Sequence, residues 1–149
     1  MDIRTAYDAG TLALDFALDG ADLATDDGLE TAAAISLFTD RRAERDDTLP
    51  GGDDDRRGWW GDAFTEVEGD RIGSRLWLLG REKNQPEALN RARDYGAEAL
   101  AWMVEDGIAE RVEVVATAPL DNVLLLDVAI FRPNDPPVRF RFERFWNDL

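Results

Sequence analysis

Three carboxylates flank a pair of adjacent tryptophans, and this arrangement could support glycoside hydrolysis. Asp55, Asp62 and Glu66 lie within a few residues of Trp59 and Trp60. A glycosidase needs two carboxyl groups, about 5 Å apart for retention of configuration or roughly 6.5 to 9.5 Å apart for inversion. The chain holds 32 acidic residues, however, so carboxylates near any tryptophan are expected by chance. Hydrolysis of a saccharide such as peptidoglycan is therefore the alternative prediction and not the first.

Two residue types that carry much of enzyme chemistry are missing from the sequence. The chain has no histidine and no cysteine, which excludes Ser-His-Asp triads, Cys-His pairs and the usual zinc sites. Asp15, Asp19, Gly20 and Asp26 match four positions of a calcium-binding loop, but alanine stands at two further ligand positions and the last ligand is a short Asp. Solvated turns explain this segment better. We predict no metal, no cofactor and no catalytic residue.

The tryptophan pair in the stretch DRRGWWGD (residues 55–62) admits two interpretations. Two indoles left in water would form an adhesive apolar patch, so they must pack on something. They could close the end of a small core, or one ring could turn outward to a partner while Arg56 or Arg57 pairs with acids. Adjacent residues in extended backbone point to opposite faces, so both interpretations can hold at once. Tryptophan and arginine are also the residue types most enriched among interface hot spots.

The charge of the chain excludes some classes of partner. The net charge is −15, and the 17 basic residues are arginines except for Lys83. Such a charge repels nucleic acid and anionic membrane surfaces. The charge could also suggest an acidic DNA mimic. The arginines are interspersed among the acids, however, so the negative charges do not form the rows that would imitate phosphates. The N-terminus lacks an apolar run after a basic start, so we expect a chain made and used in a cytoplasm, unless an assembly carries it out.

The length of 149 residues suits one domain, residues 1–149, with a core of its own. Alternation predicts a half-buried strand over residues 11–18, and alanines favour a helix over 29–39. Residues 42–61 form a long irregular stretch, of the kind that is usually functional or mobile. The apolar run 72–79 is interpreted as a short strand or a buried turn of helix.

The second half of the chain predicts the fold class. Asn84 or Gln85 can cap a helix that has Pro86 at its first position and ends at Asp106 and Gly107. The inner side of this helix is lined by small residues, so it can lie very close to a sheet. Strands are predicted over 111–118, 123–132 and 138–142. The order of elements predicts an α+β fold: an antiparallel strand meander packed on one long helix, with an N-terminal strand and a long tryptophan-containing loop.

Four segments, in order, carry a resemblance to a known family. They are ISLFTDRRA (35–43), DRRGWWGD (55–62), GSRLWLLGREK (73–83) and ALAWMVEDGIAERVEV (99–114). Together they resemble the small tail proteins of Mu-like phages known as gene product forty-six, and the match runs over nearly the whole chain. The resemblance implies a structural subunit of a contractile-tail baseplate wedge, located in the tail of the virion and made in the cytoplasm of a bacterial host. The implied partners are larger wedge proteins, the tail sheath and the hub or tube proteins.

Related small wedge proteins carry a Glu-Pro-Arg motif at the junction between helix and strand. EDGIAERV (105–112) occupies that place here. Two possibilities therefore stay open for Glu105, Glu110 and Arg111: the same wedge contact, or none. Some of these relatives carry an old "tail lysozyme" label, which is the source of the peptidoglycan-hydrolase alternative.

The residues also predict contact surfaces directly. Terminal strands can pair with a neighbour through the main chain, so residues 11–18 or 138–146 are candidates for strand addition. We expect Trp59, Trp60 and Trp77 to brace the loop on the core, and Arg56, Arg57 and Arg75 to pair with acids of this chain or of a partner. The predicted partner interface consists of Arg56, Arg57, Trp59, Trp60, Glu105, Glu110, Arg111, Phe140, Phe142 and Trp146.

Overall fold

The computed structural model describes residues 28–67, 69–82 and 85–149, together with the backbone of six short strands before them. These strands are β1 (Asp2–Ile3), β2 (Thr5–Asp8), β3 (Ala13–Phe16), β4 (Leu18–Asp19), β5 (Asp22–Leu23) and β6 (Thr25–Asp26). They pair antiparallel as β1 with β6, β2 with β3 and β4 with β5. The strand predicted over 11–18 overlaps β3 and β4. Its predicted half-burial, and the calcium-loop register, lie outside the described residues.

Helix α1 (Leu29–Phe38) confirms the helix predicted over 29–39. It begins after Gly28 and buries Ala33, Ala34, Ser36 and Leu37, which lie on one side of the helix. Thr39 adopts an extended conformation and ends it. The alanines therefore outweigh the β-branched residues near the end of this segment, because burial of one helical face adds to their high helix propensity.

The predicted long helix is present as α2 (Pro86–Leu100) followed directly by α3 (Trp102–Glu105). Pro86 occupies the first turn as predicted, but Gln85 makes no side-chain capping hydrogen bond. The small residues do face the sheet: a Cβ atom added to Gly96 would lie 3.0 Å from Cγ1 of Val114. Glycine at this position therefore permits the close approach of helix and sheet.

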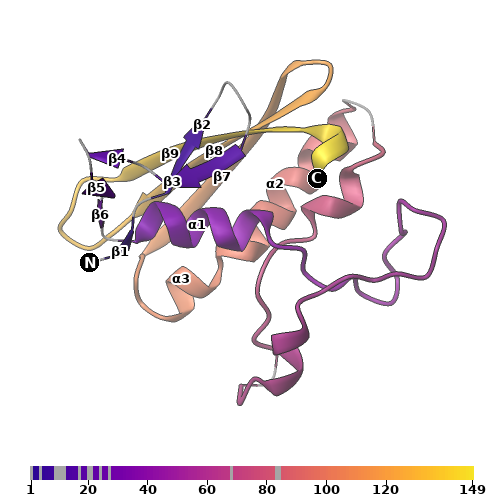
Figure 1. Cartoon of the computed structure of the whole chain (residues 1–149), viewed down its shortest axis with the longest axis horizontal. Helices are drawn as coiled ribbons and strands as arrows, with labels where there is room; N and C mark the ends of the chain where they lie inside the picture. Colours follow the sequence, from indigo (N-terminus) through magenta and orange to yellow (C-terminus); the bar gives the residue numbers. More distant parts are fainter. Residues whose placement is uncertain are drawn as a thin grey trace.

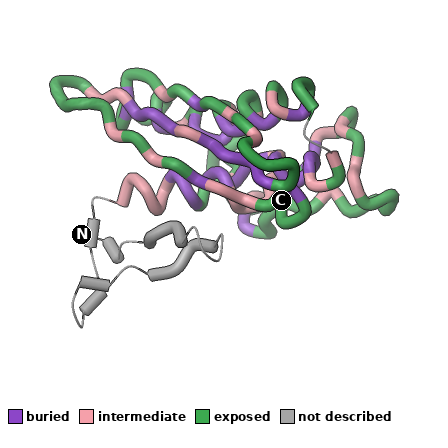
Figure 2. The backbone as a smooth tube through the Cα atoms, turned by 90° about the horizontal axis from the view of Figure 1, so that it is seen from above, coloured by how far each residue is buried: buried purple, intermediate pink, exposed green. Residues whose placement is uncertain are grey.

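Three antiparallel strands form the main sheet in the order β7 (Arg111–Leu120), β8 (Val123–Phe131) and β9 (Val138–Phe145). This is the predicted meander. Both outer strands run past their predicted ends, because β7 continues to the β8 turn and the alternation of β9 continues to Phe145. The sheet and the helices form two layers, with α1 and α2 lying along the sheet (Figure 1). Figure 2 shows that buried residues concentrate in the middle strand while the loops are exposed.

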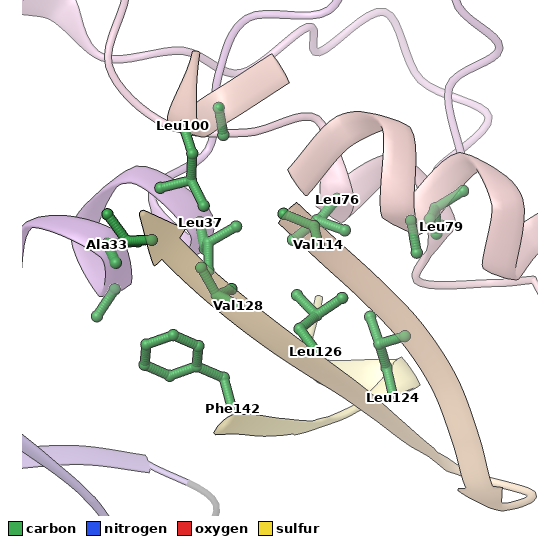
Figure 3. Close-up of a cluster of buried hydrophobic side chains, with 14 of the residues drawn as sticks. Ala33, Leu37, Leu76, Leu79, Leu100, Val114, Leu124, Leu126, Val128 and Phe142 are labelled. Carbon is green, nitrogen blue, oxygen red and sulfur yellow. The ribbon is translucent and has the colours of Figure 1, made fainter. Parts of the chain in front are cut away.

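The core lies between the helices and the sheet. Side chains from α1, α2, η2 and all three strands converge there in Figure 3, among them Leu37, Leu100, Leu126 and Phe142. The helical layer thus contains α1 as well as the α2–α3 pair, so the description of one long helix fits only loosely. Trp146, in the C-terminal turn η3 (Trp146–Asp148), also belongs to this core.

The stretch 42–61, predicted to be irregular, has no helix or strand before Trp60, where the first of two 3-10 helices that precede α2 begins. These are η1 (Trp60–Phe64) and η2 (Leu76–Leu79). The run predicted over 72–79 as a strand or a buried helical turn is the latter, since all four residues of η2 are buried. The segment around residues 60–70 extends away from the sheet and the helices (Figure 1). We call the described residues 58–67 and 69–72 the aromatic arm.

Candidate functional site

The base of the aromatic arm is fixed to the segment that follows α1. Asp40 and Ser74 form a parallel bridge, in which Ser74 N donates to Thr39 O at 2.9 Å and Arg41 N donates to Ser74 O at 2.9 Å. The Ser74 hydroxyl, which is buried, also donates to Leu37 O. At the other end of the arm, Ala43 N donates to Arg56 O at 2.9 Å, so both ends of the arm adjoin backbone that is hydrogen-bonded to the segment after α1.

Internal hydrogen bonds shape the arm itself. Asp62 Oδ1 accepts a hydrogen bond from Ile72 N at 3.2 Å, which joins the outgoing and returning segments of the arm. The Thr65 hydroxyl lies 3.3 Å from Asp62 O and 3.2 Å from Val67 O. Arg71 pairs with Glu44 at 2.9 Å and so holds the arm against the preceding loop.

The arm presents a row of exposed aromatic rings. The ring of Trp59 lies 5.5 Å from that of Trp60, and Trp60 lies 6.1 Å from Phe64 in an edge-on arrangement. Trp59 is 46% exposed, Trp60 75% and Phe64 78%. The ring of Trp59 folds back over Gly61, where an added Cβ atom would lie 2.1 Å from it. The prediction that all three tryptophans brace the loop on the core is therefore wrong for Trp60.

Trp77 does brace the loop. It is 3% exposed, and its indole Nε1 donates to Arg41 O at 2.8 Å. The guanidinium of Arg57 lies 4.5 Å from the centre of its ring and pairs with Asp40 at 2.8 Å. Arg57 thus connects the base of the arm to the buried indole by a cation–π contact as well as an ion pair.

Arg56 binds backbone carbonyls and forms no ion pair with an acid of the described residues, so of the two expected kinds of acid only one on a partner is left for it. Its guanidinium donates to Glu44 O and to Arg45 O, the latter at 3.3 Å. The five N–H groups of arginine can satisfy several carbonyls that no regular structure pairs. Arg56 therefore organises the irregular loop.

Arg75 forms the expected ion pairs. It contacts Asp47 at 3.0 Å and Glu98 at 3.0 Å, and it lies 4.7 Å from the ring centre of Tyr95. Burial opposes its charge, but the hydrogen bonds to the two carboxylates raise the pKa of Arg75 above its ordinary value. Burial also raises the pKa of the Tyr95 phenol, with Asp47 adding to the effect. This network fastens the loop to α2.

Two hollows meet at Trp59. The first, of about 430 Å³, lies between α1, the end of α2 and the inner side of the arm, and Trp59, Asp62 and Trp102 are among its lining residues. The second, also of about 430 Å³, lies on the outer side of the arm, and we call it the Trp–Arg groove. The Trp–Arg groove is lined by Arg42, Arg57, Gly58, Trp59, Trp60, Asp62, Ala63 and Arg71.

The three carboxylates considered for hydrolysis are not gathered at either hollow. Asp62 lines both, but Asp55 and Glu66 line neither. Asp55 Oδ1 accepts from Arg57 N at 2.9 Å, as Asp62 Oδ1 does from Ile72 N, so each has a role in shaping the backbone. Asp55 and Asp62 therefore shape the backbone, and the three carboxylates do not share either of these two hollows.

The predicted residues near the end of α3 lie on the surface. Glu105, Glu110 and Arg111 are all exposed. Arg111 contacts Glu113 at 3.3 Å and lies 4.0 Å from the ring centre of Phe131. These residues lie at the helix-to-strand junction, where Glu105 lines a hollow together with Asp70 and Arg71 of the aromatic arm.

The aromatic residues predicted at the C-terminal end belong to the core. Phe142 is 1% exposed and Trp146 2%, while Phe140 is half-buried against the same cluster. Phe142 pairs with Leu126 in the β8–β9 register and meets Phe38 of α1 edge-on at 5.6 Å. Because alternate residues of a strand share a face, Phe140 and Phe142 both point toward the helices. The side chains of Phe142 and Trp146 are therefore not available as a contact surface in this structure, whereas Phe140 is partly exposed.

The sequence did not predict three residues at or beside the aromatic arm. Phe64 and Val67 are 78% and 65% exposed, and Arg42 lines the Trp–Arg groove. Two apolar residues that follow the tryptophans within a polar stretch were a signal for the first two. Nothing local in the sequence indicated Arg42, which reaches the groove through the fold.

Two further features are absent from the described part of the chain. No group of three or more acidic residues there is arranged to hold a metal ion. None of the helices in the described segments has the length and apolar character needed to cross a membrane.

Comparison with known proteins places the chain in a family. The model of the family described as "Phage protein GP46" matches residues 29–137. The chain is 47% identical over 135 residues to "Baseplate protein gp46" of Escherichia phage Mu, covering 91% of each chain. It is 39% identical over 133 residues to "Mu-like prophage FluMu protein gp46" of Haemophilus influenzae, covering 89% of this chain and 90% of the relative. The matched region contains α1, the aromatic arm, α2 and the first two strands of the sheet, and the chain belongs to the phage protein GP46 family.

Proposed function

We propose that this chain is a structural subunit of a contractile phage tail baseplate and turns over no substrate. The observation that carries the proposal is the 47% identity, over 91% of both chains, to a protein named as a baseplate protein. At this level of identity over nearly full length, the fold and the positions of its surfaces are shared. The geometry supports the same conclusion, because the most distinctive exposed feature is a preformed aromatic arm. Exposed apolar patches of this kind mark protein contact sites.

In finer detail, we propose that the subunit links larger wedge proteins to the sheath or tube, and contacts hub proteins where they adjoin the wedge. A linking subunit needs at least two separate surfaces. The aromatic arm, which Glu105 adjoins, supplies one, and the exposed start of β7 with Glu110 and Arg111 supplies a second. The subunit is made in the cytoplasm of the bacterial host and resides in the baseplate of the assembled tail.

The sheet offers a third contact. Strand β9 is an outer strand of the β7–β8–β9 sheet, and an outer strand can accept a strand from a neighbour through main-chain hydrogen bonds. Deletion of the C-terminal segment would not test this idea, because Phe142 and Trp146 would leave the core. Proline at exposed Arg139 or Arg141 disturbs the strand with less loss of core.

The experiment is deletion of the gene from the phage or prophage that encodes it. The proposal expects lysates without functional contractile tails, seen by electron microscopy, and recovery when the wild-type gene is supplied in trans. Purified protein is tested in parallel for cleavage of peptidoglycan. Normal tails after deletion would contradict the structural role. Cleavage that is lost in Asp62→Asn would favour the hydrolase instead.

A further inference from the structure

The Trp–Arg groove combines two features that differ from the rest of this surface. The chain as a whole carries a net charge of −15. The groove, however, is lined by three arginines and two tryptophans, with Asp62 as its one acidic lining residue. One oxygen of Asp62 is already occupied by Ile72 N. The groove therefore gathers three arginines and two indoles on an acidic protein, together with the carboxylate of Asp62.

The three arginines of the groove differ in how far their charges are compensated. Arg57 pairs with Asp40 at 2.8 Å, and Arg71 pairs with Glu44 at 2.9 Å. Arg42 donates to the carbonyl of Arg57 at 3.3 Å, and no carboxylate of the described residues lies within ion-pair distance of it. Arg42 is also exposed. The groove therefore offers one arginine that forms no ion pair with a carboxylate of the described residues.

The aromatic wall beside these arginines is ordered before any partner arrives. Trp60 contacts Trp59 on one side and Phe64 on the other. The arm beneath them is held by the Asp62–Ile72 and Arg71–Glu44 contacts. Rings that are already fixed lose little conformational entropy on binding, so most of the contact energy can appear as affinity.

We propose that the Trp–Arg groove, with the ridge formed by Trp60 and Phe64, binds a segment of a neighbouring baseplate protein. That segment carries an aspartate or glutamate next to an apolar side chain. The carboxylate pairs with Arg42 and the apolar side chain packs on Trp60. This inference rests on the proposed function, to which it adds the site and the chemistry of the partner.

Other anionic occupants fit less well. A nucleic acid or a membrane would bring many phosphates toward a chain whose net charge is −15, and that repulsion acts over the whole surface. A second copy of this chain would bring the same excess of negative charge. A short acidic segment on a different protein brings one or two carboxylates to the place where arginines are concentrated.

The first test uses tails assembled with variants of the full chain. Trp60→Ala removes the ridge, and Arg42→Glu reverses the free charge. Each is matched with a control of similar exposure elsewhere: Leu120→Ala, at a residue that is 67% exposed, and Arg93→Glu, at an exposed arginine of α2. The copies of each variant in purified tails are counted by mass spectrometry relative to the sheath protein.

Both groove variants are expected to lower incorporation at least about tenfold, the size expected when a hot-spot contact is lost. Both controls are expected to remain near the wild-type level. Circular dichroism and melting of the purified variants verify that each one folds. Groove variants that fold and enter tails as well as the controls do would overturn the proposal.

The second test identifies the occupant. A photoreactive benzoylphenylalanine replaces Phe64 in the otherwise intact chain, and assembled tails are irradiated. The expected cross-link joins position 64 to a different tail protein, within a few residues of an aspartate or glutamate. A cross-link to a second copy of this chain, to nucleic acid or to a segment without acids would overturn the proposal. So would particles that contain the chain but yield no cross-link.

Failure of the proposed function and failure of the groove assignment give different results. If the wild-type chain is absent from purified tails, the proposed function fails. If the wild-type chain is present and the groove variants are incorporated normally, the baseplate role stands and the assignment of the groove fails.

Discussion

Replacing tryptophan by alanine at positions 60 and 77 should separate a contact residue from a core residue within one protein. Trp60 is 75% exposed and Trp77 is 3% exposed. A fully buried tryptophan removes about 200 Å² from water, so Trp60 buries about a quarter of that area and Trp77 nearly all of it. At about 25 cal/mol per Å², the upper estimates are about 1.3 kcal/mol for Trp60→Ala and about 5 kcal/mol for Trp77→Ala.

The contacts of Trp77 add to this difference. Its Nε1 donates to Arg41 O at 2.8 Å, and Arg57 lies 4.5 Å from its ring centre. Alanine at position 77 removes the donor to that carbonyl and the cation–π contact as well as the buried area. Core replacements of this kind usually cost about 3 to 5 kcal/mol. Trp77→Ala should therefore threaten the fold itself, whereas Trp60→Ala should leave it stable.

The assay is urea unfolding followed by far-ultraviolet circular dichroism, which does not depend on the fluorescence of the rings removed. Trp60→Ala should lower the midpoint slightly with an unchanged slope, and Trp77→Ala should lower it several times more. Equal losses of free energy of unfolding in the two variants would refute the reasoning, because they would mean that Trp60 is packed on the core in solution.

Three further changes test the surroundings of the arm. Burial raises the pKa of Tyr95 above 10, so the folded chain keeps a proton that the unfolded chain releases, and stability should fall as the pH rises past 10. Tyr95→Phe should reduce this alkaline loss, measured as urea midpoints between about pH 8 and pH 11; an identical loss in both proteins would contradict it. Ser74→Ala removes the donor to the buried carbonyl of Leu37 and should cost about 1 to 3 kcal/mol in urea unfolding, so no measurable change would count against that bond. Gly61→Ala brings a Cβ atom against the ring of Trp59 and should displace the ring, seen as stronger quenching of indole fluorescence by acrylamide; unchanged quenching would show that the ring does not cover Gly61.

The regular elements could be predicted because their signals are local. Pro86 and the small-residue stripe define the start and the inner side of α2, and alternation defines β7, β8 and β9. The ends of the strands were predicted less accurately, since β9 continues to Phe145 whereas the predicted strand stopped at residue 142. The 3-10 helix η1 was not predicted, because short turns of this kind depend on contacts with distant residues.

The contact surface was harder to predict because residue type does not determine burial. Trp60 and Trp146 are the same residue and were both assigned to the interface, yet one is 75% exposed and the other 2%. The pairing of β9 with β8 and its packing under α1 decide that Phe142 and Trp146 lie inside. No local pattern in the sequence indicates which of these aromatic side chains is buried. Arg42 is the opposite case. It was not predicted to lie at the contact surface, but the path of the loop brings it to the groove.

The central claim is that this protein is a structural subunit of a phage tail baseplate. The most direct measurement is the location of the chain in contractile tails purified from the phage or prophage that encodes it, by quantitative mass spectrometry and by antibody labelling in electron micrographs. The account predicts a fixed number of copies per tail, with label at the baseplate end. Intact tails that lack the chain, or label found only on free protein in the lysate, would contradict it.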